Sequence, residues 1–420
     1  MSHLDNENLL SSKQHGFVKG RSTTTQLLSY LTECVEAVSC GEVVDSIYFD
    51  FAKAFDSVPH QRLLSKLSSY GFSGLLLQWI RSFLLERQQI VRVNGCYSRS
   101  CKVLSGVPQG SVLGPLLFVI YINDLPECVS SSSYLFADDT KILRKITTGN
   151  DAKQLQADID KLHAWSQKWL LKFHPDKCHV RTIGNFDKIL HTERYKLGSS
   201  ELEHVFEEKD LGVVFDSELT FEVHITSKIK KANSMIGVIR RSFSFLDGKL
   251  FKQLYTSFVR PHLEYCQSVW SPHLKKSTNL LESVQRRETK LVDGLQNLSY
   301  KERLQKLHLP TLSYRRMRGD MIELFKHHNS YDEKSLSCYF RRRTKLNRGH
   351  NLQLERNFSK DGKRGSQQNS FYFRTTKMWN ELPKSVAEAE TLDTFKNRLD
   401  EYWKCHHLRS NCEELQANDS

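Results

Sequence analysis

Two adjacent carboxylates, Asp138 and Asp139, end an apolar run that begins at Tyr134. A third carboxylate, Asp50, interrupts another apolar run over residues 47–51. Ionised acids beside apolar packing are costly unless a cation or a hydrogen-bond network compensates them. If the two runs are neighbouring strands, the three carboxylates converge into the oxygen-only site that Mg²⁺ prefers, with room for substrate phosphates.

Such a site suits nucleotidyl transfer, in which two Mg²⁺ ions roughly 3.5–4 Å apart hold the attacking hydroxyl and the leaving phosphate. Metal charge keeps crowded carboxylates ionised by offsetting their mutual repulsion. Because side chains alternate along a strand, we expect Asp138 to be the firm ligand and Asp139 a looser one. Taken alone, the Asp-Asp pair is explained more simply as a hairpin turn.

The elements that would position these acids follow from the residue pattern. Residues 43–51, rich in Val, Ile, Tyr and Phe, predict a strand, and the serines at 130–133 predict a turn before a strand that carries Asp138. The other elements expected in the first half are a helix within 14–36, helices within 60–85 broken at Gly71, a hairpin over 88–104 turning at Asn94-Gly95, a helix over 111–121, a helix over 151–172 and a strand over 210–215.

The second half is predicted to be mainly helical. Its clearest pattern is an apolar stripe with alternating spacings of four and three residues, made of Ile225, Ile229, Ala232, Ile236 and Ile239. Off this stripe lie the basic residues Lys228, Lys230, Lys231, Arg240 and Arg241. We also expect a helix over 250–258 that ends near Pro261, a polar linker over 341–370 and a last helix over 392–403.

The basic charge is localised. Residues 221–350 contain 26 Lys and Arg and 11 Asp and Glu, a surplus of +15, whereas the whole chain carries +13 and its remainder −2. Such an excess is typical of a protein that binds a polyanion. The alternative is a solvated basic helical face without a partner.

The composition is that of a globular protein, with 39% hydrophobic and 26% charged residues over 420 positions. No apolar stretch is long enough to span a bilayer, the polar N-terminus is unlike a secretory signal, and the ten cysteines form no regular framework. We therefore expect an intracellular protein, in the nucleus, the cytoplasm or both, without a membrane partner. Half of a zinc site could be formed by Cys405, His406, His407 and Cys412, although their spacing matches no closed zinc finger.

Four segments in the right order resemble the reverse transcriptases of retrotransposons that lack long terminal repeats, with the jockey-like branch the most similar. Residues 45–60, which include Phe-Asp-Phe-Ala-Lys-Ala-Phe-Asp, resemble the first palm motif, residues 104–115 the second, and Phe136-Ala-Asp-Asp139 the third. The segment Gln14-His-Gly-Phe-Val-Lys-Gly-Arg-Ser22 is similar to a stretch upstream of the palm. The resemblance is strong from residue 14 to about 216 and weaker as far as a tail at 373–383.

The resemblance implies a role for each matching position. Asp50 and Asp138 would be the main metal ligands, Asp139 would support them, and Phe51 would lend its backbone carbonyl. The residues that would contact the incoming nucleotide are Phe55, as a steric gate against a 2′-hydroxyl, together with Gly106, Gln109, Gly110, Lys19 and Arg21. Lys177 would protonate the leaving pyrophosphate, and the strand with Leu211 and Gly212 would be a primer grip. The ordinary alternatives are a core aromatic for Phe55 and a surface lysine for Lys177.

The fold implied is α+β: a right-hand polymerase palm with partial fingers, an antiparallel sheet packed with helices, then a mostly helical thumb and a C-terminal tail. Its expected divisions are a loose N-terminus (1–13), fingers and palm (14–216), thumb (217–330), and linker with tail (331–420). The thumb would hold an RNA–DNA duplex by phosphate contacts at Lys228, Lys230, Lys231, Arg240 and Arg241. The expected activity is RNA-directed DNA synthesis from dNTPs with two Mg²⁺ ions, for which Mn²⁺ can substitute.

An intact element of this kind would also carry an endonuclease and a first fingers motif upstream, so we expect an N-terminally truncated copy. The alternative is a catalytically defective remnant that only binds nucleic acid. A second alternative is an RNA-copying RNA polymerase, against which Phe55 argues because ribonucleotides need space at that position. The template, the insertion site and the oligomeric state stay open.

Overall fold

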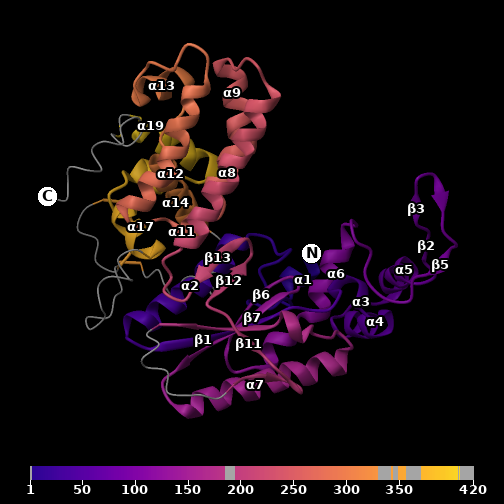
Figure 1. Cartoon of the computed structure of the whole chain (residues 1–420). Helices are drawn as coiled ribbons and strands as arrows, with labels where there is room; N and C mark the ends of the chain where they lie inside the picture. Colours follow the sequence, from indigo (N-terminus) through magenta and orange to yellow (C-terminus); the bar gives the residue numbers. More distant parts are fainter. Residues whose placement is uncertain are drawn as a thin grey trace. The chain divides into compact units, whose positions relative to one another are not determined.

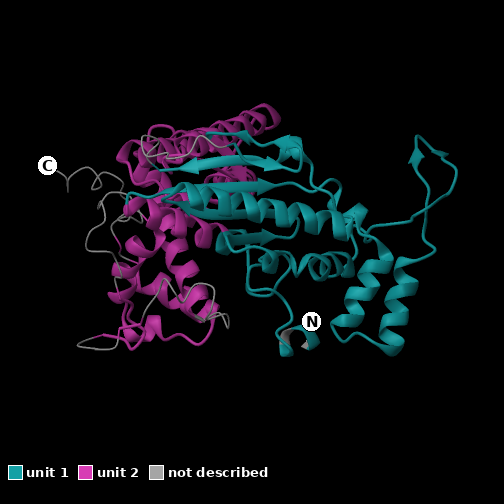
Figure 2. Cartoon of the chain, turned by 90° about the horizontal axis from the view of Figure 1, so that it is seen from below, with its two compact units in different colours: residues 1–26, 41–206 teal, residues 27–40, 207–420 magenta. Residues whose placement is uncertain are grey.

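The computed structural model describes residues 2–184, 194–329, 342–343, 349–355, 370–404 and 406. Two compact units divide the chain (Figure 2). The N-terminal unit comprises residues 1–26 and 41–206, and the C-terminal unit comprises residues 27–40 and 207–420. The expected mixture of helix and sheet is confirmed, with the sheet of five strands in the N-terminal unit and mainly helices in the C-terminal unit (Figure 1).

The sheet of the N-terminal unit has the strand order β11-β8-β1-β7-β6. Its members are β1 (Val43–Phe49), β6 (Ser132–Phe136), β7 (Asp139–Ile146), β8 (His179–Ile183) and β11 (Glu203–His204). All neighbours pair antiparallel except β11, which is parallel to β8. The central strand β1 is almost entirely buried, as its run of Val, Ile, Tyr and Phe predicts.

Two helices supply most of the apolar packing for this sheet. Helix α6 (Leu113–Ile122) is apolar on nearly every side and is buried along most of its length. Helix α7 (Gly149–Trp169) runs along one face of the sheet and buries the predicted stripe of Leu155, Ile159, Leu162 and Trp165 (Figure 1). A capping box begins α7 at Thr148, and Leu170 ends it in the left-handed conformation, so the helix stops three residues before the predicted limit of 172.

The other elements of the N-terminal unit agree with most of the sequence expectations. Gly71, at φ 83°, separates two of its helices as predicted. The hairpin over 88–104 turns at Asn94 and Gly95, whose φ values of 47° and 85° are those of a type I′ turn. The short elements are α1 (Ser2–Asn6), α3 (Ala54–Ser57), α4 (His60–Ser69), α5 (Gly74–Leu84), β2 (Gln88–Gln89), β3 (Arg92–Val93), β4 (Cys96–Tyr97), β5 (Cys101–Lys102), η1 (Leu125–Cys128), η2 (Pro175–Lys177), β9 (Lys196–Leu197) and β10 (Ser200–Glu201).

The first residues, expected to be loose, make specific contacts in the structure. Leu4 is buried in the core, and α1 begins the chain. The side chain of Asn123, just after α6, accepts a hydrogen bond from Ser11 N and donates one to Leu9 O. This segment therefore leads directly into the stretch at residues 13–16, which lies against the sheet.

The C-terminal unit begins with a hairpin and a long helix. Strands β12 (Glu207–Asp210) and β13 (Val213–Asp216) pair antiparallel, and α8 (Glu222–Ser242) follows. The predicted stripe on α8 is confirmed: Ile225, Ala232, Ile236 and Ile239 are buried and Ile229 is half-buried. Part of α2 (Thr23–Ser39) also belongs to this unit, where the Tyr30 ring meets Phe215 edge to face at 5.7 Å.

The predicted helix end near Pro261 is wrong. After α9 (Gly248–Leu254) a π-helical stretch, Tyr255–Val259, leads into α10 (Arg260–Glu264), with Pro261 in its first turn. A proline is tolerated there because its missing N–H would have had no helical partner, and the π-helical stretch just before it shifts the hydrogen-bond ladder. The buried face is Phe251, Tyr255 and Val259, whereas Phe258 is exposed.

Further helices complete the C-terminal unit. They are α11 (Gln267–Trp270), α12 (Lys275–Glu288), η5 (Thr289–Leu291), α13 (Tyr300–Leu307), α14 (Leu312–Asn329), α17 (Phe371–Asn380), α18 (Lys384–Ala387) and α19 (Leu392–Tyr402), the last in agreement with the predicted final helix. Most of the expected linker over 341–370 lies outside the described residues. Within the described part of the chain, every helix is too short or too polar to cross a membrane.

Candidate active site

The sheet brings the ends of β1 and β7 together, and with them two of the three predicted carboxylates. Phe49 pairs with Thr140, so Asp50 comes one residue after this pair on β1, while Asp138 and Asp139 come just before it on the β7 side. Asp138 is half-buried, and burial raises the pKa of its carboxyl above the ordinary value. The charge of Asp50 raises this pKa further, so the two acids interact electrostatically.

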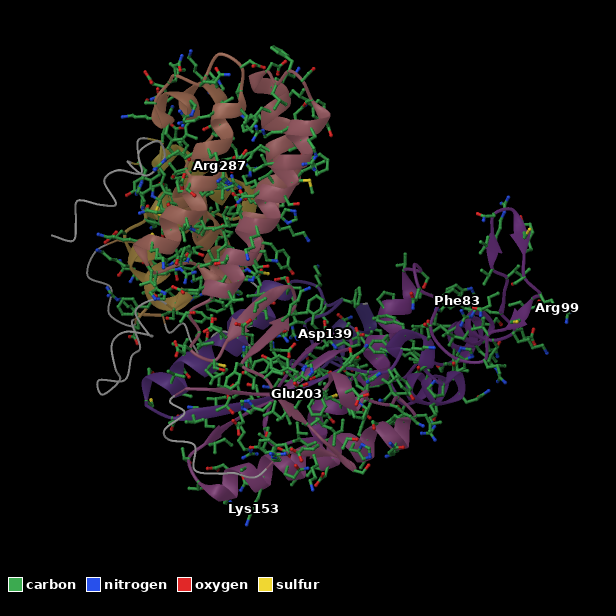
Figure 3. The ribbon with its side chains drawn as sticks, in the orientation of Figure 1. Phe83, Arg99, Asp139, Lys153, Glu203 and Arg287 are labelled. Carbon is green, nitrogen blue, oxygen red and sulfur yellow. The ribbon has the colours of Figure 1, made fainter. Side chains whose placement is uncertain are left out.

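Asp138 lies in a turn rather than in the predicted strand. Strands β6 and β7 form a hairpin whose two-residue loop is Ala137-Asp138, and Phe136 pairs with Asp139 across it. Ala137 adopts φ 53°, which gives the loop its sharp reversal. Asp139 therefore begins β7 with an exposed side chain (Figure 3).

The predicted convergence of three carboxylates is accordingly reduced to a pair. Among the residues that the structure describes, no group of three or more His, Cys, Asp or Glu side chains is arranged to hold a metal ion. The expectation placed Asp138 on a strand and gave a hairpin turn as the simpler alternative; the structure has the turn, between Phe136 and Asp139. Asp50 and Asp138 are therefore the two candidate metal ligands.

Asp50 is held from the side opposite β7. Its carbonyl accepts a hydrogen bond from His174 N at 2.8 Å, and Ala52 N donates to Lys172 O at 2.8 Å. In an antiparallel pairing of this kind, the residue between Asp50 and Ala52 directs its own N–H and carbonyl away from the partner strand. That residue is Phe51, whose carbonyl is therefore not used by this pairing, while its ring stacks on Phe173 at 4.4 Å.

A lysine lies beside the Asp50 carboxylate. Lys177 Nζ, at the end of η2, is 3.3 Å from Asp50 Oδ2. This oxygen is buried and makes no hydrogen bond within the described residues. The structure thus brings Lys177, Asp50 and Asp138 to one place, as the sequence motifs implied.

Cys178 is a neighbour of the site that the sequence did not single out. Its thiol accepts a hydrogen bond from Asp50 N at 3.5 Å. Burial raises the pKa of this thiol to about 11. Its role is to support the backbone at Asp50, and a lone cysteine in the sequence carries no signal for such a role.

The donor set fits a divalent cation. Asp50 offers a buried carboxylate oxygen without a hydrogen-bond donor, and Asp138 a carboxylate whose ionised form is disfavoured by burial and by its neighbour. A cation between them would relieve both penalties, and carboxylate and carbonyl oxygens are the ligands that Mg²⁺ accepts.

The second motif packs against the first through Asp56 in α3. Gly106 adopts φ 88°, and a Cβ there would lie 2.7 Å from the Asp56 Cα and carbonyl oxygen, so only glycine fits. Gln109 Nε2 donates to Asp56 Oδ1 at 2.9 Å, and Ser105 Oγ donates to Asp56 O at 2.8 Å. Gly110, at φ 77°, has open space around it. The loop at 105–110 is therefore tied to α3 beside Phe55.

Phe55, Lys19 and Arg21 have different surroundings. The Phe55 ring is half-buried and stacks on Phe118 at 4.4 Å. Lys19 is exposed. The Arg21 guanidinium donates to the carbonyls of Ser11, Ser12 and Gln14, an arrangement that braces the loop before α2.

In the C-terminal unit the turn at Leu211-Gly212 is held by two side chains. Both residues have positive φ, 45° and 84°, as in a type I′ hairpin. Tyr265 OH donates to Leu211 O at 2.9 Å, and Lys228 Nζ donates to Gly212 O at 3.0 Å. Burial lowers the pKa of Lys228, and nearby Lys231 and Lys209 lower it further. Lys228 thus supports this turn.

The other four predicted basic residues on α8 lie on its exposed side. These are Lys230, Lys231, Arg240 and Arg241. Lys230 and Lys231 lie in the middle of this 21-residue helix and Arg240 and Arg241 in its last turn, and the opposite side of the helix is buried. This division into an apolar face and a basic face agrees with the sequence pattern.

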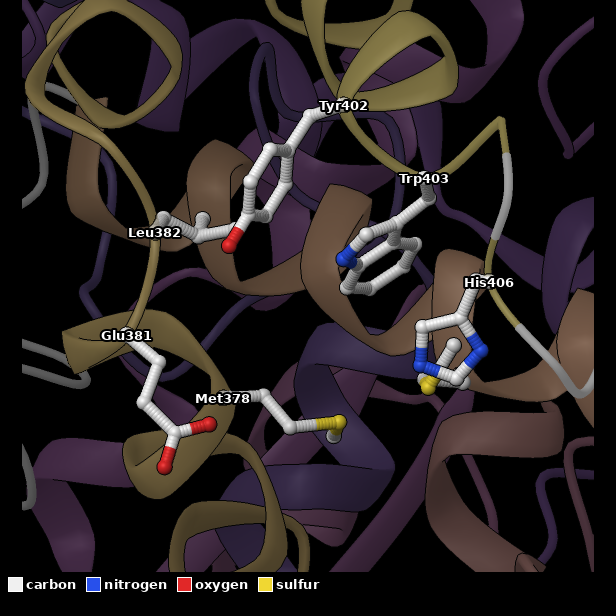
Figure 4. Close-up of a pocket in the computed structure, with 7 residues that line it drawn as sticks. Met378, Glu381, Leu382, Tyr402, Trp403 and His406 are labelled. Atoms are coloured by element: carbon white, nitrogen blue, oxygen red, sulfur yellow. The ribbon is translucent and has the colours of Figure 1, made fainter.

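A separate pocket of about 370 Å³ occurs within the C-terminal unit (Figure 4). It is lined by Met317, Met378, Glu381, Leu382, Tyr402, Trp403 and His406. His406 belongs to the Cys/His segment considered above for zinc, whereas Cys405, His407 and Cys412 lie outside the described residues.

Comparison with known proteins agrees with the motifs. The family model described as reverse transcriptase (RNA-dependent DNA polymerase) matches residues 1–231. The RNA-directed DNA polymerase from mobile element jockey of Drosophila funebris is 32% identical over 297 residues, which are 67% of this chain and 32% of that protein. The probable RNA-directed DNA polymerase from transposon BS of Drosophila melanogaster is 28% identical over 301 residues, 68% of this chain and 33% of that protein.

This chain therefore spans about a third of the length of these two relatives. Among solved structures, apo telomerase from Candida tropicalis aligns with a TM-score of 0.39 at 10% identity, over 73% of this chain and 51% of that chain.

Proposed function

The chain belongs to the reverse transcriptase (RNA-dependent DNA polymerase) family, and from this premise we propose that it performs RNA-directed DNA synthesis at Asp50 and Asp138. The observation that supports the proposal best is the meeting of these two carboxylates at the ends of adjacent strands. The retrotransposon polymerases to which the chain is similar indicate the same reaction class.

Asp50 and Asp138 would bind the divalent ions, with the Phe51 carbonyl as a further donor and Asp139 in a supporting position. Two Mg²⁺ ions, or Mn²⁺ in their place, would supply Lewis-acid stabilisation of the attacking 3′-hydroxyl and the leaving phosphate. Lys177, whose ammonium already lies 3.3 Å from Asp50, is the candidate for protonating the departing pyrophosphate.

The incoming dNTP would lie against the loop at 105–110. Gly106 and Gly110 let the backbone approach the nucleotide, and Gln109 lies between them, bonded to α3 next to Phe55. We propose Phe55 as the steric gate against a 2′-hydroxyl, since its ring is only half-buried and is held flat by Phe118. Lys19 and Arg21 are proposed phosphate contacts, the first exposed and the second already bound to backbone carbonyls.

Residues 14–216 would form the palm with partial fingers, 217–330 the thumb, and 331–420 a linker and tail. The turn at Leu211-Gly212 would be the primer grip. The exposed basic face of α8 would hold the RNA template and DNA primer through their phosphates, and therefore without sequence preference. The protein would act inside the cell, in the nucleus, the cytoplasm or both.

Primer extension on poly(rA)/oligo(dT) tests the proposal. We expect Asp50→Ala and Asp138→Ala each to slow extension by at least about a hundredfold, because stabilisation by a bound metal contributes several kcal/mol. Asp160→Ala is the matched control, because Asp160 is exposed on α7 and accepts a hydrogen bond from the neighbouring Gln156 side chain, far along the sequence from both acids. Equal extension by the wild type and both variants would refute the assignment.

A second candidate is a protein that binds nucleic acid without catalysis. The exposed Lys230, Lys231, Arg240 and Arg241 favour it, because phosphate binding by this face needs no carboxylates. Salt-dependent duplex binding together with no extension at any Mg²⁺ or Mn²⁺ concentration would select this candidate.

A further inference from the structure

We propose that Gln14 is a positioning residue for the active site: its side chain, together with the close approach of Gly16, holds the Ala137-Asp138 turn in the conformation that presents Asp138 to Asp50. The inference rests on the proposed function, since it concerns a carboxylate assigned there to metal binding. Gln14 touches neither carboxylate, so it acts through the turn.

The Gln14 side chain is 1% exposed and is bonded directly to the turn. Its Oε1 accepts a hydrogen bond from Ala137 N at 2.9 Å and a second from Gly16 N at 2.7 Å. Its Nε2 lies 3.5 Å from Ala137 O. One amide side chain therefore binds both backbone polar groups of the residue that precedes Asp138.

Gly16 brings the backbone against the same turn. A Cβ at this position would lie 2.3 Å from Ala137 N and 2.9 Å from the Phe136 carbonyl carbon. Both contacts are with backbone atoms, which cannot swing aside as a flexible side chain would. The turn can therefore occupy this position only because residue 16 has no side chain.

The segment that carries Gln14 and Gly16 is itself anchored on both sides. His15 N donates to Leu135 O at 2.8 Å, and Leu135 N donates to Lys13 O at 3.1 Å, a parallel pairing with the strand that leads into the turn. His15 Nδ1 is 2.9 Å from Thr25 Oγ1 at the start of α2. The backbone that carries Gln14 is therefore held in place by hydrogen bonds on both sides.

The turn needs such support for two physical reasons. Ala137 has φ 53°, a conformation that a residue with a side chain adopts only at a cost when nothing enforces it. Asp138 and Asp50 also lie at the ends of adjacent strands, where their like charges repel each other. Without the Gln14 bonds, the turn would relax and carry Asp138 away from its partner.

The test measures binding of Mn²⁺ alone to the full chain, by the electron paramagnetic resonance signal of free Mn²⁺, with hydrogen exchange of the Ala137 amide as a second readout. Gln14→Met keeps the length of the side chain and removes the acceptor. Gly16→Ala keeps the acceptor and introduces the steric conflict. We expect each variant to raise the Mn²⁺ dissociation constant about 10- to 100-fold, as loss of a residue that orients a metal ligand does.

Two matched controls separate positioning from general loss of stability. Gln285→Met removes the bonds of another fully buried glutamine, which lies in the C-terminal unit and binds Tyr255, Tyr300 and Pro310. Gly149→Ala adds a Cβ at a glycine with open space around it. Both controls should bind Mn²⁺ as the wild type does, whatever their melting temperatures.

Hydrogen exchange on the wild type keeps the inference testable even if a variant fails to fold. The Ala137 amide should be protected in the wild type and should exchange faster in Gln14→Met. An Ala137 amide that exchanges at the rate of an unstructured peptide in the wild type would overturn the inference.

The Asp138→Asn variant distinguishes the positioning role of Gln14 and Gly16 from the metal-binding role of Asp138. If it loses Mn²⁺ binding while Gln14→Met and Gly16→Ala retain wild-type binding, the positioning role alone is refuted. If Asp138→Asn binds Mn²⁺ as the wild type does, the metal site itself is refuted, and the inference with it.

Discussion

At the scale of single residues, the ionised Asp138 side chain lowers the free energy of unfolding when no cation is bound. Burial and the charge of Asp50 raise its pKa above the ordinary value of 3.8 that the unfolded chain would show. Between these two pKa values the folded protein binds more protons than the unfolded chain, so the free energy of unfolding falls as pH rises through that window. Above the window the full penalty of the ionised carboxylate persists.

Asp138→Asn should therefore raise the melting temperature in EDTA at pH 7.5, because an amide carries no charge to bury. The difference should shrink as pH is lowered and disappear below the ordinary pKa of 3.8, where the carboxyl is protonated in the folded and the unfolded state alike. Thermal unfolding across this range measures the effect. A variant that melts below the wild type at pH 7.5 in EDTA would show that the carboxylate is stabilising by itself.

Addition of Mg²⁺ should reverse the order of the melting temperatures of the wild type and Asp138→Asn. A ligand that binds only the folded state stabilises it in proportion to the logarithm of its concentration over its dissociation constant. The wild type should gain melting temperature on addition of Mg²⁺, whereas Asp138→Asn should not.

Predictability at the residue scale was uneven. The acids beside apolar runs singled out Asp50 and Asp138, because burying a charge without a partner is costly, whereas Lys177 was singled out only by the family resemblance. A hairpin turn at the Asp-Asp pair was only the simpler alternative, and its position at Ala137-Asp138 was not predicted, because positive φ at an alanine has no signal in the sequence. The hydrogen bonds from Gln14 were missed as well, since a pairing over more than a hundred residues depends on the complete fold.

At the scale of elements, Asp158 links α7 to β7 and to the residues just before β6. Its side chain is 1% exposed and accepts hydrogen bonds from the backbone and hydroxyl groups of Ser130 and Ser131, with Arg144 and Lys161 as charged partners. Burial alone would raise the pKa of this carboxyl, but the bonds from Ser131, Lys161 and Ser130 outweigh it and hold the pKa well below its usual range.

We expect Asp158→Ala to lower the free energy of unfolding by about 3 kcal/mol, because it leaves buried donors and the Arg144 charge unpaired. The wild-type contribution is present above the ordinary pKa of 3.8 and is lost as pH falls toward the lowered pKa of the folded state. Denaturant unfolding at pH 7 measures it. Asp160→Ala on the same helix is the control, expected within ~0.5 kcal/mol of the wild type. Equal stability of the two variants would contradict this role.

Elements with a strong local pattern were predictable. The stripes on α7 and α8 repeat with helical spacing, and Asn94-Gly95 is a residue pair that a type I′ turn requires. The path through Pro261 was not, because proline is usually a helix breaker and only the π-helical stretch before it lets the chain continue. Tertiary packing of Phe251, Tyr255 and Val259 decides that segment.

At the scale of the whole molecule, charge is divided unequally along the chain. The surplus of +15 lies within residues 221–350, and the remainder of the chain carries −2. A basic helix face that binds phosphates releases counterions, so its affinity for nucleic acid falls steeply with salt.

Replacing Lys230, Lys231, Arg240 and Arg241 together by alanine should reduce the salt dependence of RNA–DNA duplex binding. We expect the slope of log affinity against log salt to fall by about 0.9 for each phosphate that the variant no longer neutralises. Fluorescence anisotropy at several salt concentrations measures it. Lys153→Ala with Lys168→Ala on α7 is the control, since both lysines are exposed in the N-terminal unit; Lys153 is labelled in Figure 3. An unchanged slope in the fourfold variant would place the duplex elsewhere.

The central claim is that Asp50 and Asp138 act as one site, and a double-mutant cycle on the rate of dNTP incorporation tests it most directly. Residues that act as a unit are strongly non-additive. We therefore predict that Asp50→Asn combined with Asp138→Asn is about as slow as either single variant. If the two losses multiply, or if either single variant keeps the wild-type rate, the two carboxylates do not share a site and the account is contradicted.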